Sequence, residues 1–165
     1  VTGMTVALTG ESAVNPQVPS VGLPFAICHE MCHRMAIYPE AEADFGAFLA
    51  CRFNSSLEFQ YSAYLMAFRH CYNALASINT SYGRDAVARV GGDADAQVMR
   101  DIAAYEAFLG AGASEPNDEL CKLLVSWHLQ EVVIPRQEAE NEANKKFDPM
   151  DESDERLKDI VEGTA

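Results

Sequence analysis

The chain has 165 residues, of which 48% are hydrophobic, and it carries a formal net charge of −13. This length and composition suit one globular domain rather than a disordered chain, and no stretch holds the roughly 18 uninterrupted apolar residues of a membrane helix. A surface this acidic repels phosphate backbones, so we expect no nucleic-acid partner. The chain itself is therefore expected to be a soluble domain.

Helices dominate the predicted secondary structure. A short β-prone run at residues 4–8 comes first, and the residues 9–20 that follow are rich in turn formers. Apolar spacing of three and four residues, together with prolines and serines at helix starts, predicts the helices. They cover residues 23–36, 39–53, 57–78, 94–109, 117–133 and 137–146, with a last short helix at 154–161. We expect Pro135 to kink or end the fifth helix.

These elements predict one mainly α domain over residues 1–165, with a short β-strand or hairpin at its N-terminus. Residues 1–22 would form an edge of strand and loop, residues 23–78 the central helices, and residues 93–165 the C-terminal helices. The C-terminal part ends in an acidic tail from about Glu138 onward, which is typical of a solvated segment.

The strongest signal is a His-Glu-x-x-His motif, formed by His29, Glu30 and His33 in the first predicted helix. Residues four apart on a helix lie about 40° apart around the axis, so both imidazoles can reach one zinc ion at about 2.0–2.1 Å. Glu30 lies about 100° around the axis from His29, where it can reach a water on the metal. The motif therefore predicts two zinc ligands and a general base.

A third ligand is expected from the second helix, because the short turn at residues 34–39 must fold that helix back against the first. Glu40 and Asp44 are four apart and share a face, which suits a liganding carboxylate and an acid that orients a zinc-bound histidine. Glu42 points about 200° away from Glu40. Because the apolar arc of this helix reaches toward both glutamates, helical phase alone does not decide between them; we favour Glu40, which has Asp44 on its face, and leave Glu42 open.

Other interpretations of the motif are weaker. A purely structural interpretation is a pair of core histidines around a surface glutamate. A buried helix would then carry three polar groups without partners, which is unfavourable. Cys28, Cys32 and His33 loosely resemble a c-type haem attachment signal, which has two residues between its cysteines rather than three. A structural zinc site of two cysteines and two histidines fails because ligands on consecutive turns of one helix cannot surround a metal tetrahedrally. The five cysteines are expected to be buried free thiols.

The segments around the motif also form a pattern in their order and spacing. They are Thr9-Gly10-Glu11, Leu23-Pro24-Phe25, the motif itself, Glu40 with Asp44, Phe48-Leu49-Ala50-Cys51, Tyr61-Ser62-Ala63-Tyr64-Leu65 and Asn73-Ala74-Leu75. From about Thr2 to Leu75 the chain resembles a bacterial family of membrane-anchored zinc proteins of unknown function, related to the gluzincin metallopeptidases. The resemblance implies a zincin-like domain with an active-site helix and a glutamate helix. It also implies His29, His33 and Glu40 as Zn²⁺ ligands, Glu30 as general base, and transmembrane helices before Val1 in a membrane-associated full-length protein.

A gluzincin normally has a tyrosine or histidine that donates to the oxyanion formed when water attacks a carbonyl. Tyr61, Tyr64 and His70 are the candidates, although the two tyrosines also belong to the apolar stripe of the third helix. The β-prone run at residues 4–8 is a candidate edge strand along which an extended peptide could add.

Three functions remain open from the sequence. The first is a zinc-dependent metallopeptidase with a peptide or protein substrate. The second is a non-catalytic zinc-binding domain with a regulatory or partner-binding role in a membrane protein, and the third is a helical interaction domain without metal. Glu30 favours the first, because a purely structural site needs no base and normally has four protein ligands.

Overall fold

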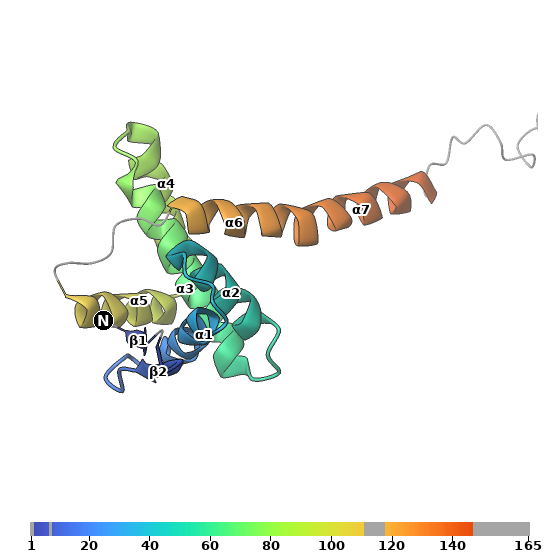
Figure 1. Ribbon diagram of the computed structural model, residues 1–165. Helices are drawn as coiled ribbons and strands as arrows, with labels where there is room; N and C mark the ends of the chain where they lie inside the picture. The colour runs from blue at the N-terminus through green and yellow to red at the C-terminus, as the bar shows by residue number, and fades with distance from the viewer. Residues whose placement is uncertain (1, 7, 111–117, 147–165) are drawn as a thin grey trace, which may run out of the picture. The chain divides into compact units, whose positions relative to one another are not determined.

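The computed structural model describes residues 2–6, 8–110 and 118–146, and it is mainly helical with a two-stranded N-terminal hairpin (Figure 1). The expected fold class is therefore confirmed. The predicted helix at residues 154–161 lies outside the described residues. The structure divides into two compact units, Val1–Val125 and Ser126–Ala165.

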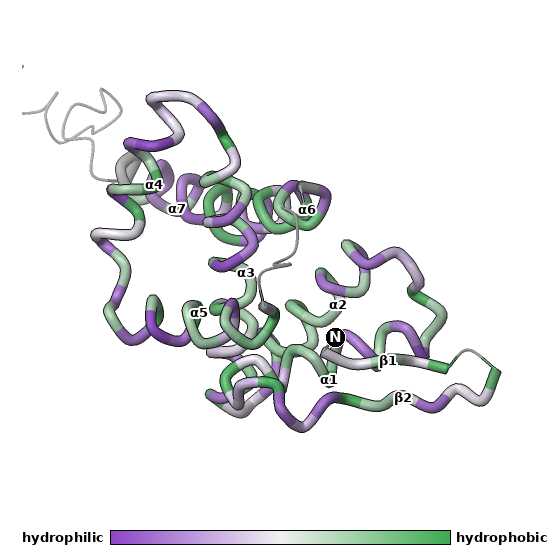
Figure 2. The backbone as a smooth tube through the Cα atoms, turned by 90° about the vertical axis from the view of Figure 1, so that its left-hand side faces the viewer, coloured by the Kyte–Doolittle hydropathy of each residue, from purple (hydrophilic) through white to green (hydrophobic). Residues whose placement is uncertain are grey.

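The hairpin consists of β1 (Gly3–Val6) and β2 (Glu11–Val14), which pair antiparallel with Thr5 opposite Ser12. The sequence predicted a strand or a hairpin at the N-terminus; the structure has the hairpin, and its second strand is β2, within the turn-rich residues 9–20. Its residues alternate between exposed and half-buried, and they form a strand because β1 pairs with them and α1 packs beside both strands. Figure 2 shows the two strands running side by side next to α1.

Three helices form the centre of the first unit and lie side by side (Figure 1). They are α1 (Leu23–Arg34), α2 (Glu40–Arg52) and α3 (Leu57–Ser77), and their predicted positions are confirmed. Small residues let α1 and α2 approach closely: Ala43, Ala47 and Cys51 on α2 are fully buried. The approach matters because α1 carries the histidine motif and α2 begins at Glu40.

The buried face of α3 differs from the predicted apolar stripe. Leu57 and Tyr64 of that stripe are 79% and 48% exposed, whereas Ser62 and Arg69 are buried. The Ser62 hydroxyl accepts a hydrogen bond from the Phe25 N–H at the start of α1, at 3.2 Å. This bond satisfies an N-terminal donor of α1 that has no partner within its own helix. The buried face of α3 thus carries these two polar residues beside the apolar Ala63, Leu65 and Met66, and apolar periodicity alone does not predict the polar pair.

The remaining helices of the first unit follow α3. α4 (Ser81–Asp93) was not predicted, because its three glycines are unfavourable in a helix, whereas α5 (Ala96–Leu109) was. Thr80 caps α4 by accepting from the Gly83 N–H at 3.0 Å. This cap and the packing of α4 against α3 offset the low helix propensity.

The fifth predicted helix begins as α6 (Asp118–His128), which spans the boundary between the units. It leads through a π-helical turn, η1 (Leu129–Val133), into α7 (Ile134–Lys146). The chain stays helical through Pro135 rather than ending there. Because proline has no N–H to donate, the widened hydrogen-bond pattern just before it accommodates the missing donor.

In the part of the chain that the structure describes, no helix combines the length and the apolar character that crossing a bilayer requires.

The packing of α1 on α2 predicts an effect of substituting Gly46. A Cβ there would lie 2.8 Å from the Cys32 Sγ, so Gly46→Ala should lower the free energy of unfolding by about 1–3 kcal/mol. Gly92→Ala is the matched control, since nothing lies within 4 Å of a Cβ at that position; it should gain up to about 1 kcal/mol from helix propensity. Urea unfolding measures both. The loss of stability caused by Gly46→Ala should be smaller in a Cys32→Ala background, where the Sγ is absent. Equal stability of Gly46→Ala and Gly92→Ala would contradict this packing.

Candidate metal centre

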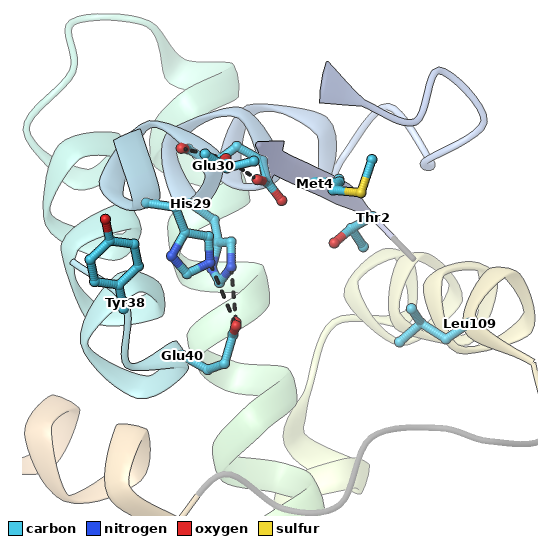
Figure 3. A pocket seen from close by; sticks show the side chains of 10 residues that line it. Thr2, Met4, His29, Glu30, Tyr38, Glu40 and Leu109 are labelled. Carbon is cyan, nitrogen blue, oxygen red and sulfur yellow. Dashed lines mark hydrogen bonds and ion pairs between the residues drawn. The ribbon is translucent and has the colours of Figure 1, made fainter. Parts of the chain in front are cut away.

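His29 and His33 of α1 and Glu40 of α2 converge on one point, and Figure 3 shows His29 and Glu40 facing each other. The His29 Nε2 lies 3.1 Å from one carboxylate oxygen of Glu40, and the His33 Nε2 lies 3.6 Å from the other. One ligand atom of each residue lies within 4.8 Å of the other two. Among the described residues, this is the group of histidine, cysteine, aspartate and glutamate side chains that is arranged to hold a metal ion.

The turn between the two helices places Glu40 opposite the histidines. α1 ends at Arg34, and Ala36 adopts a left-handed conformation with φ at 65°, which reverses the chain within a few residues. Pro39 then precedes the first residue of α2 with the φ of −63° that its ring imposes. Glu40 is therefore presented at the very start of α2, facing the C-terminal turns of α1.

The outer nitrogens of both imidazoles already have partners. The His29 Nδ1 lies 2.7 Å from the Asp44 carboxylate, and the His33 Nδ1 lies 2.8 Å from the Ile37 carbonyl oxygen. A carbonyl or carboxylate oxygen only accepts, so each Nδ1 carries the hydrogen that it donates. When the rings are neutral, each Nε2 presents a lone pair to the common point, which is the arrangement that a zinc ion requires. The donor set thus fits zinc.

The charges around His29 favour a cation at this point. Burial alone lowers the pKa of His29, but the hydrogen bond to Asp44 and the negative charges of Asp44, Glu40 and Glu30 outweigh it, so the pKa is raised. The same negative charges that favour a proton on His29 also favour a metal ion between the ligands.

A cavity of about 520 Å³ opens in front of the three side chains. One wall is β1 with the residue before it, and Glu30, His33 and Tyr38 contribute to the rest. Glu30 is only 4% exposed, and its side chain points from α1 toward β1 (Figure 3). The predicted base and the predicted ligands thus face the same space.

A second cavity of about 190 Å³ shares His29 and Glu40 with the first and is also lined by Asp44, Arg69 and His70. The Arg69 guanidinium donates to Glu106 at 2.7 Å. It also lies 3.5 Å from the His70 Nε2, and because a guanidinium can only donate, this contact favours the His70 tautomer with its hydrogen on Nδ1. Burial lowers the pKa of His70, which keeps this ring neutral near pH 7.

The other predicted site residues lie elsewhere. The Tyr61 hydroxyl donates to Asp101 at 2.6 Å, and Tyr64 packs edge-on against Phe48. Neither tyrosine lines the two cavities beside the histidines, and Glu42 does not line them either. Of the three candidates for oxyanion stabilisation, the structure thus brings only His70 next to the candidate ligands.

Sequence reasoning missed Tyr38 and the inward face of β1. Tyr38 lines the metal-side cavity and is 64% exposed. The sequence feature that could have identified Tyr38 is its position in the turn between the two ligand-bearing helices. On β1, the half-buried Gly3 and Thr5 alternate with the exposed Met4 and Val6. The alternation separates the two faces of the strand, but only the packing of α1 on β1 shows which face is buried.

Comparison with known families finds one match. A family model described as "Protein of unknown function (DUF3810)" matches residues 1–130, a range that includes every residue of the two cavities. No curated protein and no solved structure matches the chain.

The geometry predicts that Glu40 rather than Glu42 is the third ligand. Glu40→Gln should lower zinc affinity by more than the roughly 10–100-fold that loss of an outer-shell hydrogen bond costs, because a direct ligand is removed. Glu42→Gln removes the same charge from the same helix and should bind zinc like the wild type. Competition against a chromophoric chelator measures both affinities. A larger loss of zinc affinity in Glu42→Gln than in Glu40→Gln would identify Glu42 as the third ligand instead.

The pairing of His29 with Asp44 predicts a pH effect. Zinc and protons compete for His29, so affinity should fall as the pH drops through the raised pKa of this histidine, at a higher pH than an ordinary histidine would give. Asp44→Asn removes causes that raise this pKa, so the fall should move to lower pH. At pH 7.5 the same variant should bind zinc about 10–100-fold more weakly, because the ring is less well oriented. Chelator titrations from pH 5.5 to 8 test both effects.

Proposed function

The chain belongs to the DUF3810 family of proteins of unknown function, and from its site we propose that it is a gluzincin-like zinc metallopeptidase. The convergence of His29, His33 and Glu40 beside Glu30, in one cavity, carries the proposal. A site of three protein ligands with an acid at the open side is typical of hydrolytic rather than structural zinc. Attachment of the full-length protein to a membrane, through segments outside this chain, belongs to the same proposal.

Zinc held by the three ligands would lower the pKa of a coordinated water to about 7 and polarise a carbonyl oxygen. Glu30 accepts a proton from the water as its oxygen bonds to the carbonyl carbon, and negative charge develops on the carbonyl oxygen. Glu30 then delivers this proton to the amine nitrogen, and the C–N bond breaks as the carbonyl is restored. The neutral His70, with its hydrogen on Nδ1, is the candidate donor to the negative charge that develops on the carbonyl oxygen. Asp44 keeps the His29 ring in position.

The substrate that suits this cavity is an extended peptide. β1 pairs with β2 along one edge, and among the described residues it has no strand partner on the other. Thr2, Gly3, Met4 and Thr5 line the cavity that contains the candidate ligands. A peptide that adds along this strand would form main-chain hydrogen bonds with it and bring a peptide bond to the metal.

The proposal predicts that Glu30→Gln retains zinc but loses hydrolysis. The amide cannot take the proton, so the hydrolysis rate should fall by about 10²–10⁴-fold. Turnover of a quenched fluorescent peptide library and the zinc content of the same samples measure the two effects. Glu42→Gln, which changes an acid outside the cavities, should keep the wild-type rate. Removal of zinc with a chelator should abolish the rate, and its return should restore it.

Other outcomes would identify the alternatives. One zinc per chain in both wild type and Glu30→Gln, with no cleavage by either, would favour a non-catalytic zinc-binding domain with a regulatory or partner-binding role. Absence of zinc from both would leave a helical interaction domain.

A further inference from the structure

We propose that Thr5 is a positioning residue that holds the Glu30 carboxylate through a relay of hydroxyl groups beginning at Ser12. The inference rests on the proposed role of Glu30 as the base. It assigns a role to two residues of the N-terminal hairpin, Thr5 and Ser12, which lie outside the His-Glu-x-x-His motif.

The relay follows from three oxygen atoms. The Thr5 Oγ1 lies 2.6 Å from the Glu30 Oε2 and 2.8 Å from the Ser12 Oγ. An ionised carboxylate can only accept, and a hydroxyl has one hydrogen to give. Thr5 therefore donates to Glu30 and accepts from Ser12. The separation of 2.6 Å is typical of a hydroxyl bonded to a charged oxygen, and the second bond strengthens the first by polarising the Thr5 hydroxyl.

The register of the hairpin directs the hydroxyls of Thr5 and Ser12 toward α1. Thr5 and Ser12 are directly opposed across the hairpin, so their side chains lie on the same face. Each hydroxyl also lies near the main-chain oxygen of Glu30, at 3.3 and 3.2 Å. The neighbours on β1, Met4 and Val6, are on the opposite face and are 63% and 39% exposed. The shorter bonds of the pair thus fix the Glu30 side chain, and the two longer contacts place the hairpin against the backbone of the same residue.

Gly3, two residues before Thr5 on the same face of β1, leaves room for the Glu30 side chain. A Cβ at this position would lie 2.5 Å from the Glu30 Oε1 and 2.6 Å from its Cγ. Only a glycine leaves room for the carboxylate where Thr5 holds it. β1 thus contacts both oxygens of Glu30, one by a hydrogen bond and one by close packing.

This arrangement assigns different roles to the two oxygens. Oε2 accepts from Thr5, which satisfies part of the hydrogen-bonding capacity of a carboxylate that is only 4% exposed. Oε1 has no hydrogen-bond partner among the described residues, so it is the oxygen left to take a proton. Thr5 therefore presents the base in one orientation at the metal-side cavity.

The experiment compares three substitutions in the zinc-loaded protein. Thr5→Val keeps the shape but removes the hydroxyl, and it should lower kcat about 10–100-fold with KM nearly unchanged, because a misplaced base slows the chemical step. Thr5→Ser keeps the hydroxyl and should restore kcat to within about twofold of wild type. Thr9→Val is the matched control on the same hairpin, since the exposed Thr9 hydroxyl is near Glu11 rather than Glu30. Equal kcat values for Thr5→Val and Thr9→Val would overturn the proposal.

Crystal structures of the zinc-free variants give a readout that needs no activity. The Glu30 carboxylate should leave its place against Gly3 in Thr5→Val and keep it in Thr5→Ser. An unchanged carboxylate in Thr5→Val would refute the positioning role even if the protein proves to be a peptidase. Conversely, a wild type that cleaves no peptide contradicts the proposed function, while the carboxylate positions still decide the role of Thr5. Should Thr5→Val fail to fold, Ser12→Ala weakens the same relay and should displace the carboxylate in part; no displacement would count against the proposal.

Discussion

The close packing of α1 against α2 is the constraint on which the candidate centre depends. Two imidazoles on one helix can reach a common point alone, but the third donor must come from outside that helix. Buried small residues on α2 and the absence of a side chain at Gly46 let this helix approach α1. The left-handed Ala36 reverses the chain in a turn short enough to leave Glu40 opposite the histidines. A wider spacing would leave the carboxylate out of reach.

Three groups of the candidate centre, the two histidines and Glu30, have hydrogen-bond partners elsewhere in the fold. Asp44, one turn into α2, accepts from His29, and the Ile37 carbonyl in the connecting turn accepts from His33. Thr5 on β1 donates to Glu30. Each bond fixes a ring or carboxylate by an atom that faces away from the common point, so the atoms that face it stay available. The negative charges of Asp44, Glu40 and Glu30 around His29 also favour a bound cation.

The hairpin and the polar side of α3 have roles that hydrophobicity alone does not explain. Two short strands are marginally stable in isolation, and here they pack on α1 through the hydroxyls that contact Glu30. On α3 the buried Arg69 pairs with Glu106 of α5 and lies over the Tyr105 ring, with its guanidinium carbon 5.2 Å from the ring centroid. A buried cation needs such partners. These polar contacts shape the second cavity, where His70 lies beside His29.

The sequence by itself determined the features that depend on neighbours along the chain. The spacing of His29 and His33 on one helix face follows from the helical repeat, and apolar periodicity and capping predicted α1, α2, α3 and α5. Only the tertiary structure decided which contacts join these elements. Helical phase could not separate Glu40 from Glu42, because their direction relative to α1 depends on the turn between the helices. The burial of Ser62 and Arg69 depends on partners in α1 and α5. Thr5 and Gly3 reach Glu30 because the hairpin docks on α1, and a contact between residues 25 apart leaves no periodic trace in the sequence.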